Sequence, residues 1–482
     1  MEASNKSIVK ATKWSVFTEI LAKLAAPISS MILARILAPE AYGIIASVSM
    51  LLSFCELFAD AGFNKYIVQH KVKDEDELNK IITIAFWTNL FLTLCLWGIV
   101  SVCAKPIAEL VGCPGKELAV IVACANLPIH GLVSILSAKL RRDMDFKTLF
   151  IVRAILLLVP FLITIPVALA TKSYWALIIG TIAGNLTNLL ALCIRLKWKP
   201  ILFYNIKILQ EMFSFSMWSM LEAFFVWLIN WGDVFIVAQL LAQDQLGIYR
   251  TSINMVSQIT GIVSASVIPV LLSSLSKAQN DDQEFKDLFY SFSTVTGLFL
   301  IPMGVGMFIY RDLMCYVALG DAWTAGATLM GIWGLVNSIT ILFNSFNGHV
   351  LIAKGKPKIS VILQIIQIAF ILPAVYISAK TSFEFLSYTS ALIRLSGTVL
   401  YCIVIWKMYK ISCFKTLRTL IPTLVATAFM ACAGIYFTSL GLSTGLALGS
   451  ILACVLIYGV ILFLFPSIRR NYVPILRKLI KK

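Results

Sequence analysis

The sequence predicts an all-α protein that crosses a membrane about fourteen times. Hydrophobic residues make up 59% of the 482 residues and charged residues only 13%, whereas a water-soluble domain is nearer half apolar and a quarter charged. Apolar runs of about 20 residues, the length that spans a hydrocarbon core of about 30 Å, recur along the whole chain. The chain is therefore interpreted as a multi-pass membrane protein.

Fourteen apolar runs are long enough to be membrane spans. The first run follows a lysine-rich start, as a secretion signal would, but it exceeds the roughly 7 to 15 apolar residues of a signal and contains Lys23. An even number of spans puts both termini on the same side of the membrane. The expected spans are residues 14–37, 42–67, 81–104, 117–138, 149–171, 174–194, 212–241, 247–275, 288–310, 324–353, 359–379, 385–406, 419–439 and 444–465.

The distribution of Lys and Arg predicts that both termini are cytoplasmic. Cytoplasmic loops of membrane proteins are enriched in these residues. Of the 40 Lys and Arg residues, 30 fall on the side of the termini, seven on the opposite side and three within spans. The net charge of +16 therefore reflects orientation in a membrane and does not indicate nucleic-acid binding.

A ten-residue pattern occurs twice in the chain, 204 residues apart. Residues 34–43 match residues 238–247, with Gly43 opposite Gly247, and two further pairs continue the match at offsets of 208 and 215. Internal duplication in a hydrophobic chain is typical of transporters built from two halves around a central site. We therefore predict a six-helix lobe at 1–200, a second at 201–410 with the two matching turns facing outward, and two extra helices with a basic tail at 411–482.

Two segments outside the spans have simple structural interpretations. Asp74, three residues before Glu77, predicts an N-cap for the third span. The tail at 467–482 alternates apolar and basic residues, which suits an anionic lipid surface.

The eleven cysteines do not predict a disulfide framework, because no Cys-x-x-Cys pair occurs. Most lie inside apolar runs, where they are interpreted as packing residues. These are Cys55, Cys95, Cys124, Cys193, Cys402, Cys432 and Cys454. A disulfide between Cys103 and Cys113, which flank one loop, is the alternative that stays open.

Charged residues within or near the ends of the spans are the candidate functional residues. Each costs roughly 2.5 to 3.5 kcal/mol at the centre of a helix, so it is expected to face a water-filled cavity or a partner. We expect the cations to bind substrate and the carboxylates to brace the lobes or couple an ion. The candidate substrate-binding residues are Lys23, Arg394, Arg35, Arg153 and Arg250. The bracing or coupling candidates are Glu19, Glu56, Asp60, Glu222 and Asp233.

Lys23 and Arg394 are the cations expected nearest the middle of the membrane, one in each predicted lobe. Glu19 precedes Lys23 by four residues, which leaves open a simple ion pair on one helix face. Structural pairing or capping is the preferred interpretation of Asp60 and Asp233, because both lie near span ends.

Motifs for enzymatic chemistry are missing from the sequence. His70, His130 and His349 are far apart at span ends, without the spacing of a metal site or a catalytic base. No Gly-rich phosphate loop occurs, so the chain is not expected to hydrolyse ATP. We expect neither an enzyme nor a cofactor or metal.

Residues 33–43, Leu-Ala-Arg-Ile-Leu-Ala-Pro-Glu-Ala-Tyr-Gly, resemble the polysaccharide-export branch of the multidrug/oligosaccharidyl-lipid/polysaccharide flippase superfamily. That branch carries a similar Leu-Ala-Arg-x-Leu-x-Pro-x-x-Tyr-Gly between its first two spans. The resemblance covers roughly residues 10–400. Further matches, in order, are Phe58-Ala-Asp60-Ala-Gly62, Phe86-Trp87-x-Asn89, Leu246-Gly247-Ile248-Tyr249, Leu319-Gly320-Asp321-Ala322-Trp323 and Gly355-Lys356-Pro357.

The resemblance implies a flippase in the bacterial plasma membrane for a polysaccharide repeat unit carried on undecaprenyl pyrophosphate. Sugar hydroxyls and a pyrophosphate cannot enter hydrocarbon without losing hydrogen bonds worth several kcal/mol each, so a cavity must replace the water. Two lobes that open alternately to each side would supply it. A polysaccharide polymerase and glycosyltransferases are the implied protein partners, with no nucleic acid.

Two alternatives stay open. A drug or metabolite exporter of the same superfamily would couple transport to protons or sodium through acidic residues and would favour cationic cargo. A membrane scaffold of a polysaccharide synthase would not transport at all. Cations at mid-membrane depth favour the flippase over the exporter.

Overall fold

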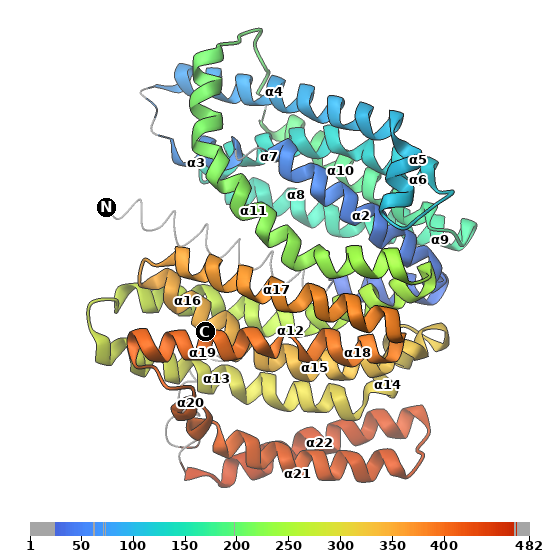
Figure 1. Ribbon diagram of the computed structural model, residues 1–482, viewed down its shortest axis with the longest axis vertical. Coiled ribbons are helices and arrows are strands. Elements are labelled where there is room, and N and C mark those ends of the chain that lie inside the picture. Colours follow the sequence, from blue (N-terminus) through green and yellow to red (C-terminus); the bar gives the residue numbers. More distant parts are fainter. Residues whose placement is uncertain are drawn as a thin grey trace. The chain divides into compact units, whose positions relative to one another are not determined.

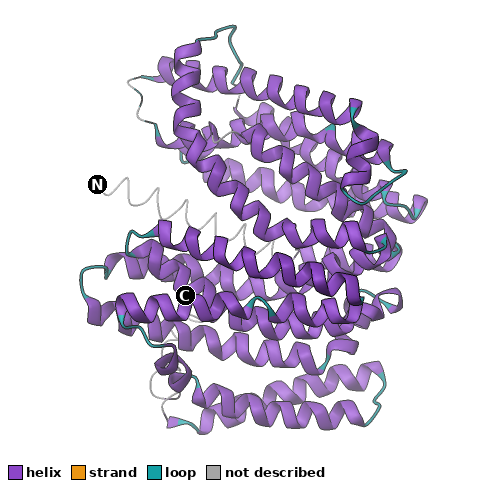
Figure 2. Ribbon diagram, in the orientation of Figure 1, coloured by secondary structure: helices purple, strands orange, loops and turns teal. Residues whose placement is uncertain are grey.

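The computed structural model describes residues 25–466 without 61, 62, 71, 73 and 197, together with residue 469. Helices make up almost all of this part, and Figure 2 shows no strand in it. Thirteen helical segments are long and apolar enough to cross a membrane. The first expected span is described only from residue 25 on, as the helix Ala25–Ile36. The predicted fold class is confirmed, and it follows from the need to satisfy every backbone hydrogen bond within hydrocarbon.

The chain divides into two compact units, Met1–Arg250 and Thr251–Lys482, whose boundary falls inside helix α12. The predicted boundaries at residues 200 and 410 separate two equivalent six-helix lobes and two extra helices, which is a different division of the chain. This division stays a prediction. After Ala25–Ile36, the first unit contains α2 (Pro39–Asp60), α3 (Phe63–Gln69), α4 (Glu75–Val102), α5 (Ala104–Leu110), α6 (Glu117–Cys124), α7 (Asn126–Arg142), α8 (Phe146–Val159), the π-helix η1 (Pro160–Thr164), α9 (Ile165–Thr171), α10 (Trp175–Leu196), α11 (Ile206–Leu240) and the start of α12 (Gln243–Lys277).

The second unit continues α12 and holds the remaining helices (Figure 1). They are α13 (Asp282–Ile309), α14 (Arg311–Ala318), the 3-10 helix η2 (Asp321–Gly326), α15 (Ala327–Thr340), the π-helix η3 (Ile341–Ser345), α16 (Phe346–Ala353), α17 (Pro357–Thr381), α18 (Phe383–Leu392), α19 (Leu395–Tyr409), α20 (Cys413–Thr419), α21 (Ile421–Ser439) and α22 (Thr444–Leu464).

Each unit packs its helices around its own apolar core. In the first unit, α7 contacts α3, α4 and α10, and residues such as Phe63, Ile82 and Ile135 are fully buried among them. In the second unit, α13 packs on both α15 and α21, and α21 pairs with α22. The red pair α21 and α22 in Figure 1 therefore belongs to the second unit's packing.

Helix α4 begins where the sequence predicts. The Asp74 carboxylate accepts a hydrogen bond from the backbone N–H of Glu77 at 2.7 Å. The predicted N-cap is therefore confirmed, and it satisfies one of the amide groups that a helix start leaves without a partner.

The two copies of the repeated turn contact each other through their glycines. A Cβ atom added to Gly43 would lie 1.8 Å from the carbonyl oxygen of Gln243, and one added to Gly247 would lie 1.9 Å from that of Pro39. Pro39 and Gln243 are themselves separated by the repeat offset of 204 residues. The contact is thus reciprocal: the glycine of each turn lies against the backbone of the other turn. Which side of the membrane the turns face stays a prediction.

We predict that Gly43→Ala destabilises the protein, because its methyl group would overlap the Gln243 carbonyl and the backbone would have to move. Overpacking of this kind costs about 1 to 3 kcal/mol. Gly98→Ala is the matched control, since nothing lies within 4 Å of a Cβ at that glycine. Thermal unfolding of the purified variants in detergent should show a lower transition temperature for Gly43→Ala only. Equal transitions would contradict the close contact.

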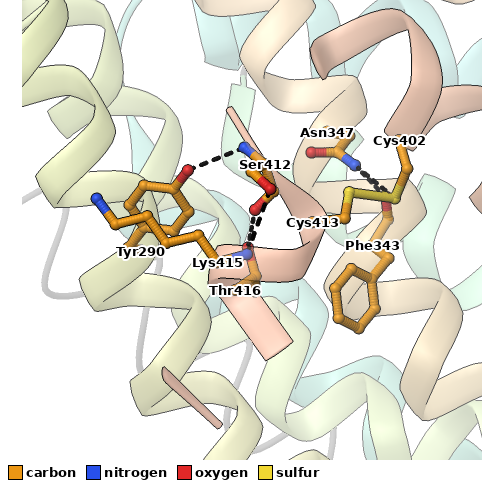
Figure 3. Close-up of a disulfide and its surroundings, with 8 residues drawn as sticks. All are labelled: Tyr290, Phe343, Asn347, Cys402, Ser412, Cys413, Lys415 and Thr416. Carbon is orange, nitrogen blue, oxygen red and sulfur yellow. Dashed lines mark hydrogen bonds between the residues drawn. A yellow bond between two sulfur atoms is a disulfide. The ribbon is translucent and has the colours of Figure 1, made fainter. Parts of the chain in front are cut away.

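A disulfide joins Cys402 in α19 to Cys413 in α20, with the Cα atoms 6.1 Å apart. Figure 3 shows it beside the connection between these helices, where the Tyr290 hydroxyl accepts a hydrogen bond from the backbone N–H of Ser412 at 2.9 Å. The interpretation of Cys402 as a packing residue is therefore wrong. Cys103 and Cys113 are both free cysteines, so the disulfide left open between them is not formed.

We predict that the Cys402–Cys413 disulfide is reduced in growing cells and forms when the isolated protein is oxidised, because the predicted topology puts this connection in the cytoplasm, which keeps cysteines reduced. Acid quenching of cells followed by maleimide labelling without a reductant should modify both residues. The exposed free cysteine Cys103, which directly follows the span Glu75–Val102, is the labelling control. A disulfide in freshly quenched cells would place this connection in an oxidising compartment and contradict cytoplasmic termini.

Candidate functional site

A cavity of about 740 Å³ opens within the first unit. Its lining comes from α2, α3, α7, α8, α10 and α11. Helix α7 contributes His130, Ser134, Ser137 and Arg141, which follow one another at the spacing i, i+4, i+7 and i+11. This spacing keeps polar side chains on one helix face. A polar stripe therefore runs along the cavity wall inside an otherwise apolar span.

The cavity carries an excess of positive charge. Among the residues that the structure describes, Lys65, Arg141 and Arg153 line it together with one carboxylate, that of Glu56. The described lining therefore has more cationic than anionic side chains. Because a membrane interior screens charge less than bulk water does, this excess acts strongly on a solute in the cavity. The lining therefore favours an anionic solute.

Polar contacts between helices connect the residues of this cavity wall. The ring nitrogen Nδ1 of His130 lies 3.5 Å from Oε1 of Glu56, which links α7 to α2. Asn64 in α3 donates a hydrogen bond to the Ser134 hydroxyl at 3.2 Å and accepts one from Arg141 at 3.5 Å. These contacts tie three helices together at the polar face, so the cavity is lined by fixed hydrogen-bonding groups.

Asp233 and Arg250 lie at the junction of α11 and α12 and do not line this cavity. The buried Asp233 carboxylate accepts the Tyr249 hydroxyl at 3.0 Å and the backbone N–H of Val234 at 2.8 Å. The guanidinium carbon of Arg250 lies 4.1 Å from the centre of the Trp231 ring, a cation–π contact. Both residues thus make contacts that connect the two helices, as structural pairing of Asp233 requires.

Arg394 lies in the second unit, at the break between α18 and α19. Its guanidinium carbon is 4.6 Å from the centre of the Trp333 ring in α15. Arg35 is exposed at the end of the helix Ala25–Ile36 and does not line the cavity.

For four of the candidate functional residues, the structure does not describe the side chain. Glu19 and Lys23 lie outside the described residues, and so do the side chains of Asp60 and Glu222. In the described part of the chain, no group of three or more His, Cys, Asp and Glu residues could hold a metal ion.

Comparison with known proteins decides the family. The family model described as polysaccharide biosynthesis protein matches residues 32–328, which is more than half of the chain. The chain belongs to this family. The resemblance of residues 33–43 to the polysaccharide-export branch of the flippase superfamily is confirmed.

Two relatives match this chain over most of their length. An uncharacterized membrane protein in the cps region of Klebsiella pneumoniae is 22% identical over 373 residues, which cover 77% of this chain and 76% of that protein. The lipopolysaccharide biosynthesis protein WzxC of Escherichia coli (strain K12) is 20% identical over 438 residues, covering 87% of this chain and 86% of WzxC.

A solved structure of the lipid II flippase MurJ, in an inward closed conformation, has the same fold. The TM-score is 0.76 with 15% sequence identity, and the match covers 95% of this chain and 98% of MurJ. At this identity the likeness concerns the fold alone.

Part of the lining of this cavity could be predicted from the sequence. Arg153 and Glu56, both predicted from their positions inside apolar runs, line it together. Lys65 and Arg141 were counted only among the cations on the side of the termini, and His130 was placed at a span end, so these three were missed. The polar spacing along 130–141 is the signal that would have revealed the α7 face.

We predict that Tyr249→Phe lowers stability without changing the cavity. The substitution removes a hydroxyl that donates to the buried Asp233 carboxylate, and a hydrogen bond to a charged group contributes about 1.5 to 3 kcal/mol. Tyr388→Phe is the control, because its side chain is 41% exposed. Thermal unfolding should shift for Tyr249→Phe alone, and an unchanged transition would contradict a bracing role for Asp233.

Proposed function

We propose that this chain is a flippase that moves a lipid-linked oligosaccharide across the plasma membrane by alternating access. The observation that carries the proposal is the cavity of the first unit, about 740 Å³ in volume, whose described lining includes three cations and one carboxylate. A cavity of this kind suits an anionic, hydroxyl-rich head group. Membership of the polysaccharide biosynthesis protein family and the likeness to WzxC support the same substrate class.

The proposed substrate is an oligosaccharide on undecaprenyl pyrophosphate. A pyrophosphate carries about two negative charges, and a cation at about 4 Å attracts each by on the order of 4 kcal/mol before desolvation is subtracted. Arg153, Lys65 and Arg141 would bind this anion near the inner entrance. Hydroxyl and amide side chains such as Ser134, Ser137 and Asn188 would replace the hydration of the sugars, while the polyprenyl chain stays in the bilayer.

The other cations keep their predicted roles within this proposal. Lys23 and Arg394 are proposed to bind the anion at mid-membrane depth as the substrate moves. The Trp333 ring stabilises the guanidinium of Arg394 by a cation–π contact. Arg35 and Arg250 are proposed to receive the anion nearer the outer side.

The orientation and the partners are proposed on sequence grounds. Both termini would be cytoplasmic, because Lys and Arg concentrate on that side. The flipped product has to be consumed by a polymerase outside the membrane, and glycosyltransferases have to supply the substrate inside.

We predict that Arg153→Ala reduces surface polysaccharide at least about tenfold in a null strain, because it removes a cation from the anion site, and that Arg153→Lys retains part of the activity. The measurement is surface polysaccharide per amount of protein in the membrane. Lys105→Ala is the matched control, since Lys105 is an exposed cation of the same unit that does not line the cavity. Lys23→Ala and Arg394→Ala are expected to abolish the polysaccharide as well.

Transport by purified protein separates the proposal from its alternatives. In vesicles that contain a fluorescent lipid-linked oligosaccharide, the wild type should expose the sugar on the opposite leaflet and Arg153→Ala should not. Wild-type activity in all three alanine variants, Arg153, Lys23 and Arg394, would refute the cationic site. Failure of the wild type to move the lipid, with normal polysaccharide in cells, would favour a scaffold.

A further inference from the structure

A second cavity, of about 710 Å³, lies in the second unit between the C-terminal end of α13, helix α14 and the pair α21–α22. Its lining is mainly apolar and aromatic, with Phe308, Tyr316, Ile435 and Phe437 among its residues. The Tyr310 hydroxyl lies 2.9 Å from the Ser450 hydroxyl and joins α13 to α22 in the cavity wall. None of these residues belongs to the cavity of the first unit.

Among the described lining residues, the charged ones are one adjacent pair, Arg311 and Asp312. Nε of Arg311 lies 3.7 Å from a carboxylate oxygen of Asp312. The guanidinium carbon of Arg311 lies 5.6 Å from the Phe308 ring centre, and a Cβ on Gly331 would be 2.9 Å from Cβ of Arg311, so Arg311 packs beside α13 and α15. The Asp312 side chain is 82% exposed. The pair therefore presents a positive and a negative group side by side with no net charge.

The cavity lies at the ends of membrane spans. Arg311 follows the span Asp282–Ile309, and Gly441 follows the span Ile421–Ser439. The charged pair is thus at head-group depth, and the apolar lining continues into the spans. Ile435 in this lining is 60% exposed, and in a bilayer an exposed apolar side chain at a span faces lipid.

We propose that this cavity binds one phospholipid whose zwitterionic head group ends in a primary ammonium. The phosphate would accept hydrogen bonds from the Arg311 guanidinium, and the ammonium would donate to the Asp312 carboxylate. An acyl chain would occupy the apolar part beside α21 and α22. The Arg311–Asp312 pair has no net charge, which suits a zwitterionic membrane lipid better than the anionic substrate proposed for the first cavity.

The charge pair also predicts which lipids are rejected. A quaternary ammonium cannot donate a hydrogen bond to Asp312, and an anionic head group without an ammonium leaves that carboxylate beside a negative charge. The charge-assisted hydrogen bond to Asp312 is expected to give a preference of about tenfold or more for the primary ammonium.

The test is native mass spectrometry of the full chain released from nanodiscs that contain equal amounts of phosphatidylethanolamine, phosphatidylcholine and phosphatidylglycerol. The wild type should retain one phosphatidylethanolamine about tenfold more often than either other lipid. Arg311→Ala and Asp312→Asn should lose this preference. Lys380→Ala is the control for charge, because Lys380 also stacks on an aromatic ring, that of Tyr376 at 4.4 Å, outside the cavity.

A second pair of variants tests the apolar part. Ala447 lines the cavity from α22, so Ala447→Phe should fill it and reduce lipid retention, whereas Leu448→Phe on the same helix, exposed and outside the lining, should not. Equal retention of the three lipids by the wild type, preference for phosphatidylglycerol, absence of a retained lipid, or unchanged retention in Arg311→Ala, Asp312→Asn and Ala447→Phe would each overturn the proposal.

Discussion

A polar atom inside a membrane has to find its partner within the protein, because hydrocarbon offers none. This constraint explains much of what the described side chains do. Arg250 and Arg394, in different units, each lie against a tryptophan ring. Asp233 accepts a tyrosine hydroxyl and a backbone amide. These charges are accommodated by contacts between helices, so they also hold the helices together.

The two cavities differ in the way that their charges are balanced. Among its described lining residues, the first gathers three cations and one carboxylate from separate helices. The second has an arginine and an aspartate adjacent in the chain, which balance each other. A site with excess charge suits a ligand that has to be attracted from water and released again. A balanced site at head-group depth suits a ligand that stays.

The sequence predicted the helices well, because apolar runs and their length depend only on local composition. Arg153 and Glu56 could be predicted because a charge stands out inside an apolar run. Lys65 and Arg141 could not, since both lie next to span ends and only the packing of α3 against α7 turns them toward the cavity. The disulfide was missed for a similar reason: the direction in which the chain leaves α19 brings Cys413 back to Cys402. Hydropathy does not indicate that the chain after a helix brings two cysteines close together.

The reciprocal glycine contact sets a limit on how the two halves of the gene can evolve. Each glycine lies against the main chain of the other copy, so a larger residue at either position cannot be compensated by a side-chain change in its own copy. Other positions of the two matching segments differ: Arg35 corresponds to Gln239. The two segments can therefore differ in charged residues and in specificity. Their two glycines, in contrast, have to be kept together.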